Sequence, residues 1–263
     1  MKSRLIALDI DGTILDKRAG IEVPLAVREA IRDARSDGAR VCLCSSRPAF
    51  FMDDAMNNLD GIDAIIGCSG AEIDIDGKVY YRDILAQQII YGCIEVAKKN
   101  NAYLSFCGEG FFYARKKNDF DHELEEHPLF DFMDDDELLE KMKNQTVPCA
   151  FIFTEQGVQE DFVTKDPLLE TANAHWSGDN TYTITNKGID KGTGLLQLAK
   201  YWDIPREVIL SVGNDENDIP MLEVSGVGVA VGNANPELFK IADWIAPDVK
   251  HAGVAEAIRR FAL

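Results

Sequence analysis

Short apolar runs alternate with amphipathic segments along residues 1–83. Residues 4–9 contain the run Leu5–Leu8, which is apolar throughout, as expected of a parallel strand buried on both faces. Apolar residues at helical spacing follow, where Pro24 favours a helix start and Gly38 a helix end. The next predicted elements are a strand at 41–44, a helix at 48–59 and a strand at 64–66. Strands and helices in alternation predict a parallel sheet covered by helices.

The segment 84–187 has a different pattern. Just before it, alternating residues around Asp76-Gly77 predict a β-hairpin at 73–81. Within it we expect a helix at 87–99, strands at 103–106 and 111–113, a helix at 136–143, a strand at 149–153, a helix interrupted near Pro167 and a strand at 181–185. The acidic stretch 119–136 is expected to be a solvated face. Strands with helices between them, set inside a βα chain, predict an inserted α+β domain.

From residue 188 the alternation of strand and helix resumes. The predicted elements are helices at 190–202, 217–224, 236–241 and 253–262 and strands at 208–212 and 227–231. Residues 1–83 and 188–263 are therefore expected to form one α/β core, a Rossmann-like doubly wound parallel sheet, with 84–187 inserted as a cap.

The charge of the chain restricts its partners. It has 27 Lys and Arg against 45 Asp and Glu, a formal net charge of −18. This charge argues against nucleic acid or an anionic membrane as the main partner. A phosphate site on such a protein must be a local positive focus or contain a metal ion.

The six cysteines form no C-x-x-C pair and mostly stand in apolar runs, so they are expected to be small buried hydrophobic residues in a reducing compartment. The first residues predict a strand instead of a leader segment, and no apolar run has the length of a membrane span. A cytoplasmic protein is the expectation. The sequence leaves the oligomeric state open.

The stretch Asp9-Ile10-Asp11-Gly12-Thr13 comes directly after the first predicted strand. Side chains two apart in a strand share one face, and ligands bind at the carboxyl ends of strands in open α/β sheets, so both carboxylates can serve one site there. Such a pair predicts a nucleophile beside an acid/base, with a hard cation between them. The alternative is an Asp-Gly turn with a second acidic residue on the surface.

Three further segments place polar residues at the same predicted edge. They are Ser45-Ser46-Arg47, Asp190-Lys191-Gly192 and the cluster 213–218 (Gly-Asn-Asp-Glu-Asn-Asp). Each alone has a structural explanation, such as a helix cap or a solvated lysine. Four such segments at one sheet edge predict an active site.

These motifs, in this order and around an insertion of this size, resemble the haloacid dehalogenase (HAD) superfamily of phosphotransferases, specifically Cof-like phosphatases with an inserted α/β cap of type IIB. Asp9 to Thr13 match the first motif, Ser45 the second, Lys191 the third and residues 213–218 the fourth. The resemblance extends over essentially the full length.

The resemblance implies a Mg²⁺-dependent phosphatase of a small phosphorylated metabolite, such as a sugar phosphate or nucleotide. Asp9 would attack phosphorus and form an aspartyl-phosphate. Asp11 would protonate the leaving alkoxide and later deprotonate water, for which it needs a raised pKa. Metal ligands would come from Asp9, the main-chain carbonyl of Asp11, Asn214 and Asp218.

The resemblance also implies a phosphate site made by Ser45, Ser46, Lys191 and Asn217. Three positions depart from the family pattern. Asn214 stands where an Asp usually binds the metal, which predicts weaker Mg²⁺ binding because an amide brings no charge. Ser46 replaces a Gly, and Cys68-Ser69-Gly70-Ala71 replaces the common Asn-Gly-Ala, which leaves the role of Ser69 open.

The cap is expected to select the substrate by closing on hinges near 82–85 and 185–189. Its candidate contacts are Arg115, His122, His175 and Trp176, of which Arg115 is the first to test. Two other functions stay open: a phosphohexomutase-like phosphotransferase, and a degenerate phosphate- or metal-binding regulatory protein.

Overall fold

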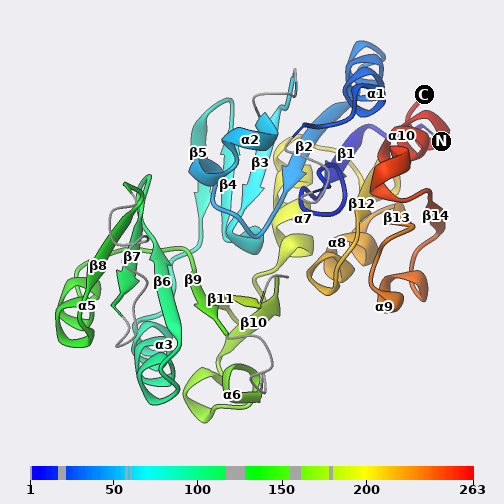
Figure 1. Ribbon diagram of the computed structural model, residues 1–263. Coiled ribbons are helices and arrows are strands. Elements are labelled where there is room, and N and C mark those ends of the chain that lie inside the picture. Colours follow the sequence, from blue (N-terminus) through cyan, green and yellow to red (C-terminus); the bar gives the residue numbers. More distant parts are fainter. Residues whose placement is uncertain are drawn as a thin grey trace. The chain divides into compact units, whose positions relative to one another are not determined.

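The computed structural model describes residues 2–16, 22–56, 59, 61–116, 128–154, 161–177 and 180–263. The chain divides into two compact units, Met1–Tyr81 with Asp190–Leu263, and Arg82–Ile189. These boundaries differ from the expected 84–187 by two residues at each end. Figure 1 shows the two units, each with its own sheet.

The first unit contains an eight-stranded sheet in the order β14-β13-β12-β1-β2-β3-β4-β5. Its strands are β1 (Leu5–Leu8), β2 (Arg40–Cys44), β3 (Ala64–Gly67), β4 (Glu72–Ile75), β5 (Lys78–Arg82), β12 (Ile209–Gly213), β13 (Val227–Val231) and β14 (Trp244–Ala246). β1 pairs in parallel with β12 and β2, so the first strand lies in the interior of the sheet. β4 pairs antiparallel with β3.

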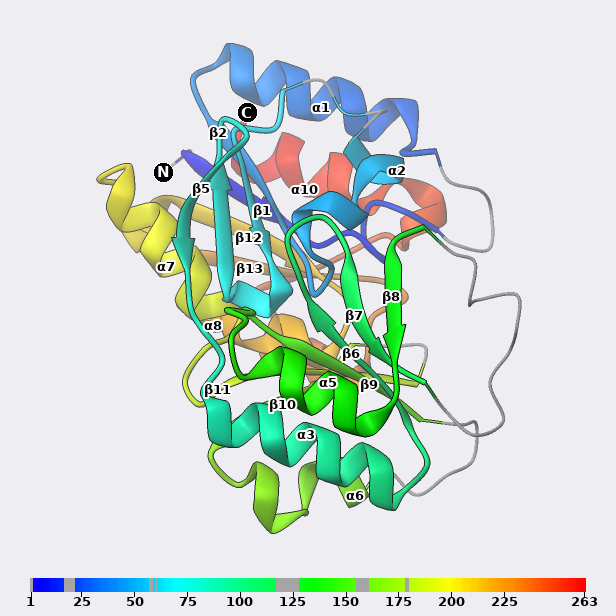
Figure 2. The same ribbon diagram turned by 90° about the vertical axis from the view of Figure 1, so that its left-hand side faces the viewer.

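Helices cover this sheet, as the alternating pattern predicts. They are α1 (Leu25–Ser36), α2 (Asp53–Met56), α7 (Lys191–Tyr201), α8 (Ile219–Val224), α9 (Pro236–Phe239) and α10 (Gly253–Phe261). α1 packs with α10, and α7 packs with α8 (Figures 1 and 2). The doubly wound α/β fold is thus confirmed.

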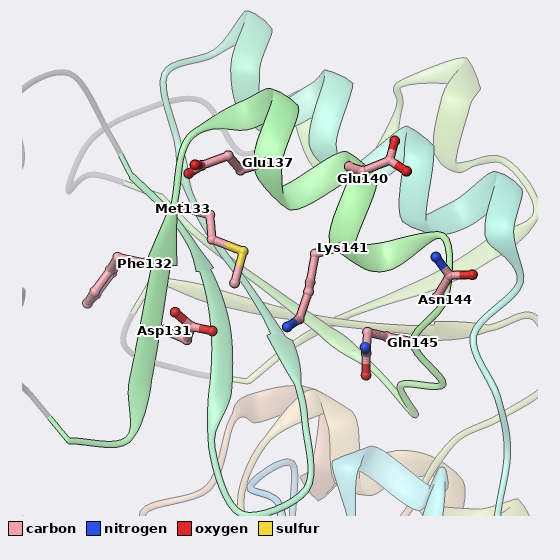
Figure 3. Close-up of a pocket in the computed structure, with 8 residues that line it drawn as sticks. All are labelled: Asp131, Phe132, Met133, Glu137, Glu140, Lys141, Asn144 and Gln145. Carbon is pink, nitrogen blue, oxygen red and sulfur yellow. The ribbon is translucent and has the colours of Figure 1, made fainter.

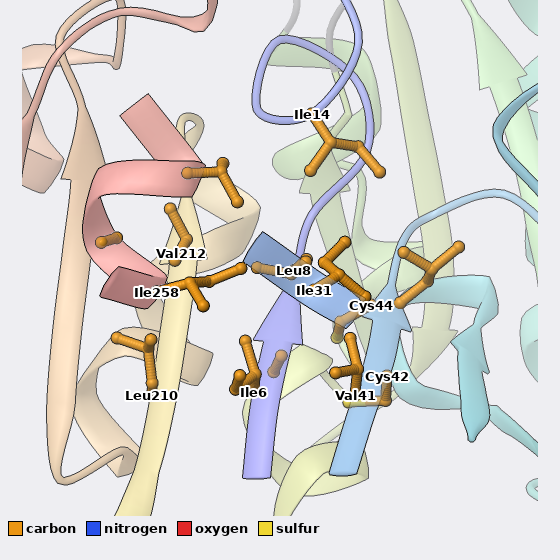
Figure 4. Packing of buried hydrophobic residues seen from close by; sticks show 14 of the residues in the cluster. Ile6, Leu8, Ile14, Ile31, Val41, Cys42, Cys44, Leu210, Val212 and Ile258 are labelled. Carbon is orange, nitrogen blue, oxygen red and sulfur yellow. The ribbon is translucent and has the colours of Figure 1, made fainter. Parts of the chain in front are cut away.

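Apolar side chains of the central strands fill the core of this unit. Ile6 and Leu8 of β1 are fully buried, with Ile31 of α1 and Ile258 of α10 in the same cluster (Figure 4). Burial of each such side chain stabilises the fold by about 1.5–3 kcal/mol. All six cysteines are buried as well, as expected of small hydrophobic residues.

The second unit contains a six-stranded sheet in the order β10-β11-β9-β6-β7-β8. Its strands are β6 (Tyr103–Cys107), β7 (Phe112–Arg115), β8 (Phe130–Met133), β9 (Ala150–Phe153), β10 (Ala172–Trp176) and β11 (Thr181–Asn186), and its helices are α3 (Gln87–Lys99), α5 (Asp135–Met142) and α6 (Asp161–Thr164). α3 packs with α5 over a separate hydrophobic core. The inserted α+β architecture matches the prediction.

Several local predictions are wrong. The helix expected around Pro167 is only α6 and a 3₁₀ turn, Pro167–Leu169, after which β10 follows. The helix expected at 48–59 is a 3₁₀ turn, Ala49–Phe51, followed by the four-residue α2. β8, which lies in the acidic stretch, and β14 are strands that the sequence did not predict.

Among the described residues, no helix combines the length and the apolar character needed to cross a membrane.

Candidate active site

Asp9 stands at the point where β1 leaves the sheet. Its N–H still donates to the main-chain oxygen of Val212 on β12 at 3.1 Å. The chain then turns at Gly12, whose φ of +86° lies in the left-handed region that favours glycine. Gly12 N–H donates to the oxygen of Leu15 at 2.8 Å, which closes the turn. The two carboxylates of the first motif are therefore held at the carboxyl edge of the central strand.

Lys191 joins two buried carboxylates at this edge. Its Nζ lies 2.7 Å from Asp9 Oδ1 and 2.5 Å from Asp218 Oδ1. Lys191 is 1% exposed and Asp218 0%. Burial raises the pKa of Asp9 to about 7, and the negative charge of Asp218 adds to this rise while Lys191 opposes it. Burial acts to lower the pKa of Lys191, but Asp218 and Asp9 hold it above its ordinary value.

The start of α7 positions Lys191. Asp190 is the N-cap residue, and its side chain accepts a hydrogen bond from Thr193 N at 2.7 Å. The Thr193 hydroxyl lies 2.9 Å from Asp190 N and completes a capping box. This arrangement fixes the first residue of the helix, so the ammonium group enters the site from a rigid element.

The loop after β12 supplies Asp218. Its Oδ2 accepts hydrogen bonds from the main-chain N–H groups of Asn214 and Asp215, at 2.8 and 3.0 Å. Its other oxygen contacts Lys191. Asp218 thus orients the loop and the lysine in this structure, while its expected role as a metal ligand stays a prediction.

The Asn214 side chain lies against three residues of the first motif, Asp9, Asp11 and Thr13. One atom of its amide is 2.9 Å from the main-chain oxygen of Asp11, 3.0 Å from Asp9 Oδ2 and 2.9 Å from Thr13 Oγ1. With nitrogen at this position, the amide donates hydrogen bonds to these oxygens. With oxygen there, it accepts a hydrogen bond from Thr13 Oγ1.

These oxygens also fit a small divalent cation. Ligands at adjacent corners of a Mg²⁺ octahedron are ~2.1 Å from the ion and so ~3.0 Å from each other. The amide atom of Asn214 has this spacing from Asp11 O, at 2.9 Å, and from Asp9 Oδ2, at 3.0 Å. With Oδ1 turned inward, Asn214, Asp9 and the Asp11 carbonyl form a donor set of the kind that Mg²⁺ prefers.

The second motif brings its two hydroxyl groups into different networks. Ser45 is buried, and its Oγ accepts a hydrogen bond from Arg47 N at 3.2 Å. Ser46 Oγ accepts from Asn217 Nδ2 at 2.9 Å and lies 2.9 Å from Ser69 Oγ. Ser46 and Ser69, which both stand at positions that depart from the family pattern, are therefore hydrogen-bonded to each other, and Ser46 also accepts a hydrogen bond from Asn217.

Arg47 contacts Asp11, a link that the sequence did not reveal. Its Nε donates to Asp11 Oδ2 at 2.8 Å, and its Nη2 donates to Asp11 Oδ1. The only signal in the sequence was the place of Arg47, directly after the two serines of the second motif.

The cap candidates lie within the second unit. Arg115 is 4% exposed, and its Nε and Nη2 donate to Asp135 at 2.5 and 3.1 Å. His175 Nε2 lies 3.2 Å from the oxygen of Ile189, and Trp176 packs against the hydrophobic core. His122 is outside the described residues. Arg115 has a structural partner here, and contact with substrate stays a prediction.

The second unit also contains a cavity of about 690 Å³ (Figure 3). The cavity is lined by three carboxylates, one ammonium group, two amides and two apolar side chains: Asp131, Phe132, Met133, Glu137, Glu140, Lys141, Asn144 and Gln145. Its excess of negative charge disfavours binding of an anionic ligand there.

Comparison with known proteins gives a consistent result. The family described as haloacid dehalogenase-like hydrolase matches residues 6–258. A phosphoglycolate phosphatase of Methanoculleus marisnigri is 28% identical over 98% of this chain and 96% of its own length. Phosphatase YwpJ of Bacillus subtilis is 26% identical over 97% of this chain and 99% of its own length.

Solved structures have the same fold. The HAD phosphatase BT1666 from Bacteroides thetaiotaomicron superimposes with a TM-score of 0.85 at 22% identity, over 100% of this chain and 96% of its own. A haloacid dehalogenase-like hydrolase of the same organism gives a TM-score of 0.79 at 25% identity, over 98% of this chain and 99% of its own.

Proposed function

The chain belongs to the haloacid dehalogenase-like hydrolase family, and we propose that it is a Mg²⁺-dependent phosphatase of a small phosphorylated metabolite. The observation that carries the proposal is the buried group of Asp9, Lys191 and Asp218 beside Asp11. A nucleophilic carboxylate next to a fixed ammonium group and a second carboxylate is suited to transfer of a phosphoryl group.

In the proposed reaction, an Asp9 oxygen attacks phosphorus in line, the bond to the leaving oxygen breaks, and Asp11 gives its proton to the departing alkoxide. Water then attacks the aspartyl-phosphate and gives a proton to Asp11, which releases phosphate and restores Asp9. Lys191 balances the charge of Asp9 and of the transferred group.

Asp9, the main-chain oxygen of Asp11 and Asn214 would hold Mg²⁺, with Asp218 as the further candidate. When bound, the ion supplies positive charge between the nucleophile and a phosphoryl oxygen. The hydroxyl groups of Ser45 and Ser46 and the Asn217 amide would hold the other phosphoryl oxygens. Ser46 and Asn217 lie within hydrogen-bond distance of each other, so both can reach the same phosphoryl group.

The proposed substrate class is a sugar phosphate or a nucleotide. The names of relatives support small phosphorylated metabolites in general: two are phosphoglycolate phosphatases, and two from Bacillus subtilis act on 5-amino-6-(5-phospho-D-ribitylamino)uracil. The net charge of −18 disfavours nucleic acid.

The test is hydrolysis of p-nitrophenyl phosphate with Mg²⁺, comparing the wild-type protein with Asp9→Asn. We expect at least about a 1,000-fold loss of turnover in the variant, because the amide is a poor nucleophile, and loss in the wild type when a chelator is added. Asp37→Asn, at an exposed ion pair with Lys2, is the control and keeps full turnover. A folded wild-type protein without turnover in several divalent metals would contradict the proposal and favour a mutase or a binding protein.

A further inference from the structure

Arg47 donates hydrogen bonds to both carboxylate oxygens of Asp11. Nε donates to Oδ2 at 2.8 Å and Nη2 donates to Oδ1, which is the two-bond fork that fixes a carboxylate in position and in plane. The two side chains are 18% and 25% exposed. The pair therefore lies at the border of the site, partly shielded from water.

The guanidinium group is itself held in place. Arg47 N–H donates to Ser45 Oγ at 3.2 Å, and its carbonyl accepts from Cys68 N at 3.0 Å. Nη1 donates to the oxygen of Phe51 at 3.4 Å. Pro48, the next residue, further restricts the backbone of Arg47. A side chain anchored at its backbone and at its tip can impose a position on its partner.

Asp11 lies beyond the end of β1, in the turn that Gly12 makes. A general acid or base must stay within hydrogen-bond reach of the proton that it transfers, and a misplacement of 1 Å is costly. The fork from Arg47 restricts the rotation of the Asp11 side chain.

We propose that Arg47 is a positioning residue that holds Asp11 in place for proton transfer to the leaving group. This inference rests on the function proposed above. The rival role for Arg47 is direct binding of the phosphoryl group, which substrates with different leaving groups can distinguish.

The experiment compares Arg47→Lys and Arg47→Met on two esters. p-Nitrophenolate departs without a proton, whereas the alkoxide of glycerol 2-phosphate needs one from Asp11. We compare kcat/KM, because it includes only the steps up to departure of the leaving group and not the later attack of water, which Asp11 assists for both esters. We expect kcat/KM on glycerol 2-phosphate to fall about 30-fold in Arg47→Met and about 10-fold in Arg47→Lys. On p-nitrophenyl phosphate we expect kcat/KM to change less than about 3-fold.

The control is a second fork of the same kind in the same unit. Arg35 donates to Asp63 through Nε at 3.2 Å and Nη2 at 2.9 Å. Arg35→Met removes that fork and is expected to leave the ratio of the two kcat/KM values unchanged. The control separates loss of a fork in general from loss of the Asp11 contact.

A second comparison uses the Asp11→Asn background. If Arg47 acts through Asp11, Arg47→Met has little further effect there on glycerol 2-phosphate. Equal losses in kcat/KM on both esters, or a full further loss in the Asp11→Asn background, would overturn the inference and assign Arg47 to the phosphoryl group. A wild-type protein that hydrolyses neither ester overturns the proposed function, and this inference with it.

Discussion

In the proposed metal site, Asn214 lies where a carboxylate would give the ion a full negative charge. Its amide can turn either end toward Asp9 and Asp11, and each end serves a different purpose. The NH₂ group satisfies two oxygens when no cation lies between them, and the carbonyl oxygen can bind a cation. An aspartate can do only the second, since it has no N–H to donate.

Replacing Asn214 with Asp should therefore change metal binding and stability in opposite directions. We expect Mg²⁺ to bind about 10-fold more tightly, because a charge replaces a dipole in the ligand set. In the presence of a chelator we expect the variant to be about 1–2 kcal/mol less stable, because a donor is lost and like charges meet. Isothermal titration with Mg²⁺ and urea unfolding measure the two effects.

Asn235→Asp is the matched control for this prediction. Asn235 caps α9 with its side-chain oxygen and donates to Glu216, so the change adds the same charge outside the three converging oxygens. Its Mg²⁺ affinity should stay within about 2-fold of wild type. Unchanged affinity in Asn214→Asp would show that this residue does not bind the metal.

Residue patterns locate the site better than they describe its contacts. Asp9 follows the end of a predicted strand, and Lys191 stands at the start of a predicted helix that reaches the same edge of the sheet. These two residues could therefore be placed together from the sequence. The contacts of Ser46 with Ser69 and of Arg47 with Asp11 depend on loop conformations that no periodicity encodes. Ser69, for example, has a φ of +52°, which its sequence context does not require.

At the scale of elements, α7 connects the fold to the chemistry. Its first residue is Lys191, and the capping box of Asp190 and Thr193 determines where the helix begins. Gly70 packs against this start so closely that an added Cβ would lie 2.0 Å from the Asp190 oxygen. The start of the helix, which carries Lys191, is thus fixed by its own capping box and by the close packing of Gly70.

Asp190→Ala should reduce both stability and turnover. Loss of the cap is expected to cost about 1 kcal/mol in urea unfolding, and kcat should fall about 5-fold because Lys191 is held less firmly. Asp134→Ala removes the matching capping box of α5 in the second unit and should cost the same stability without the loss of kcat. Equal kcat values in the two variants would show that the cap does not position Lys191.

Elements with strong periodicity were predicted, and those set by tertiary contacts were not. α1, α3 and α7 have long apolar faces and clear ends, and the buried strands of the first unit are continuous apolar runs. β10 has the sequence Ala-Asn-Ala-His-Trp and owes its extended form to pairing with β11. β14 has three residues and forms because β13 offers a free edge.

For the whole molecule, charge and site chemistry act against each other. The net charge of −18 repels a phosphate dianion over a distance of about one Debye length, ~10 Å at 0.1 M salt. Lys191 cannot offset this at long range, because Asp9 and Asp218 already surround its charge. In the proposed phosphatase, attraction of the substrate must therefore arise inside the site, from a bound Mg²⁺ and from oriented donors.

Substrate capture should consequently improve with salt. Raising the ionic strength from about 10 mM to about 150 mM at constant Mg²⁺ is expected to increase kcat/KM by about 3-fold, because salt screens the repulsion, and to leave kcat unchanged. The measurement is p-nitrophenyl phosphate hydrolysis at several concentrations of potassium chloride, with sucrose at equal osmolarity as the control. A kcat/KM that falls with salt would mean that the metal-loaded site attracts phosphate more strongly than the acidic surface repels it.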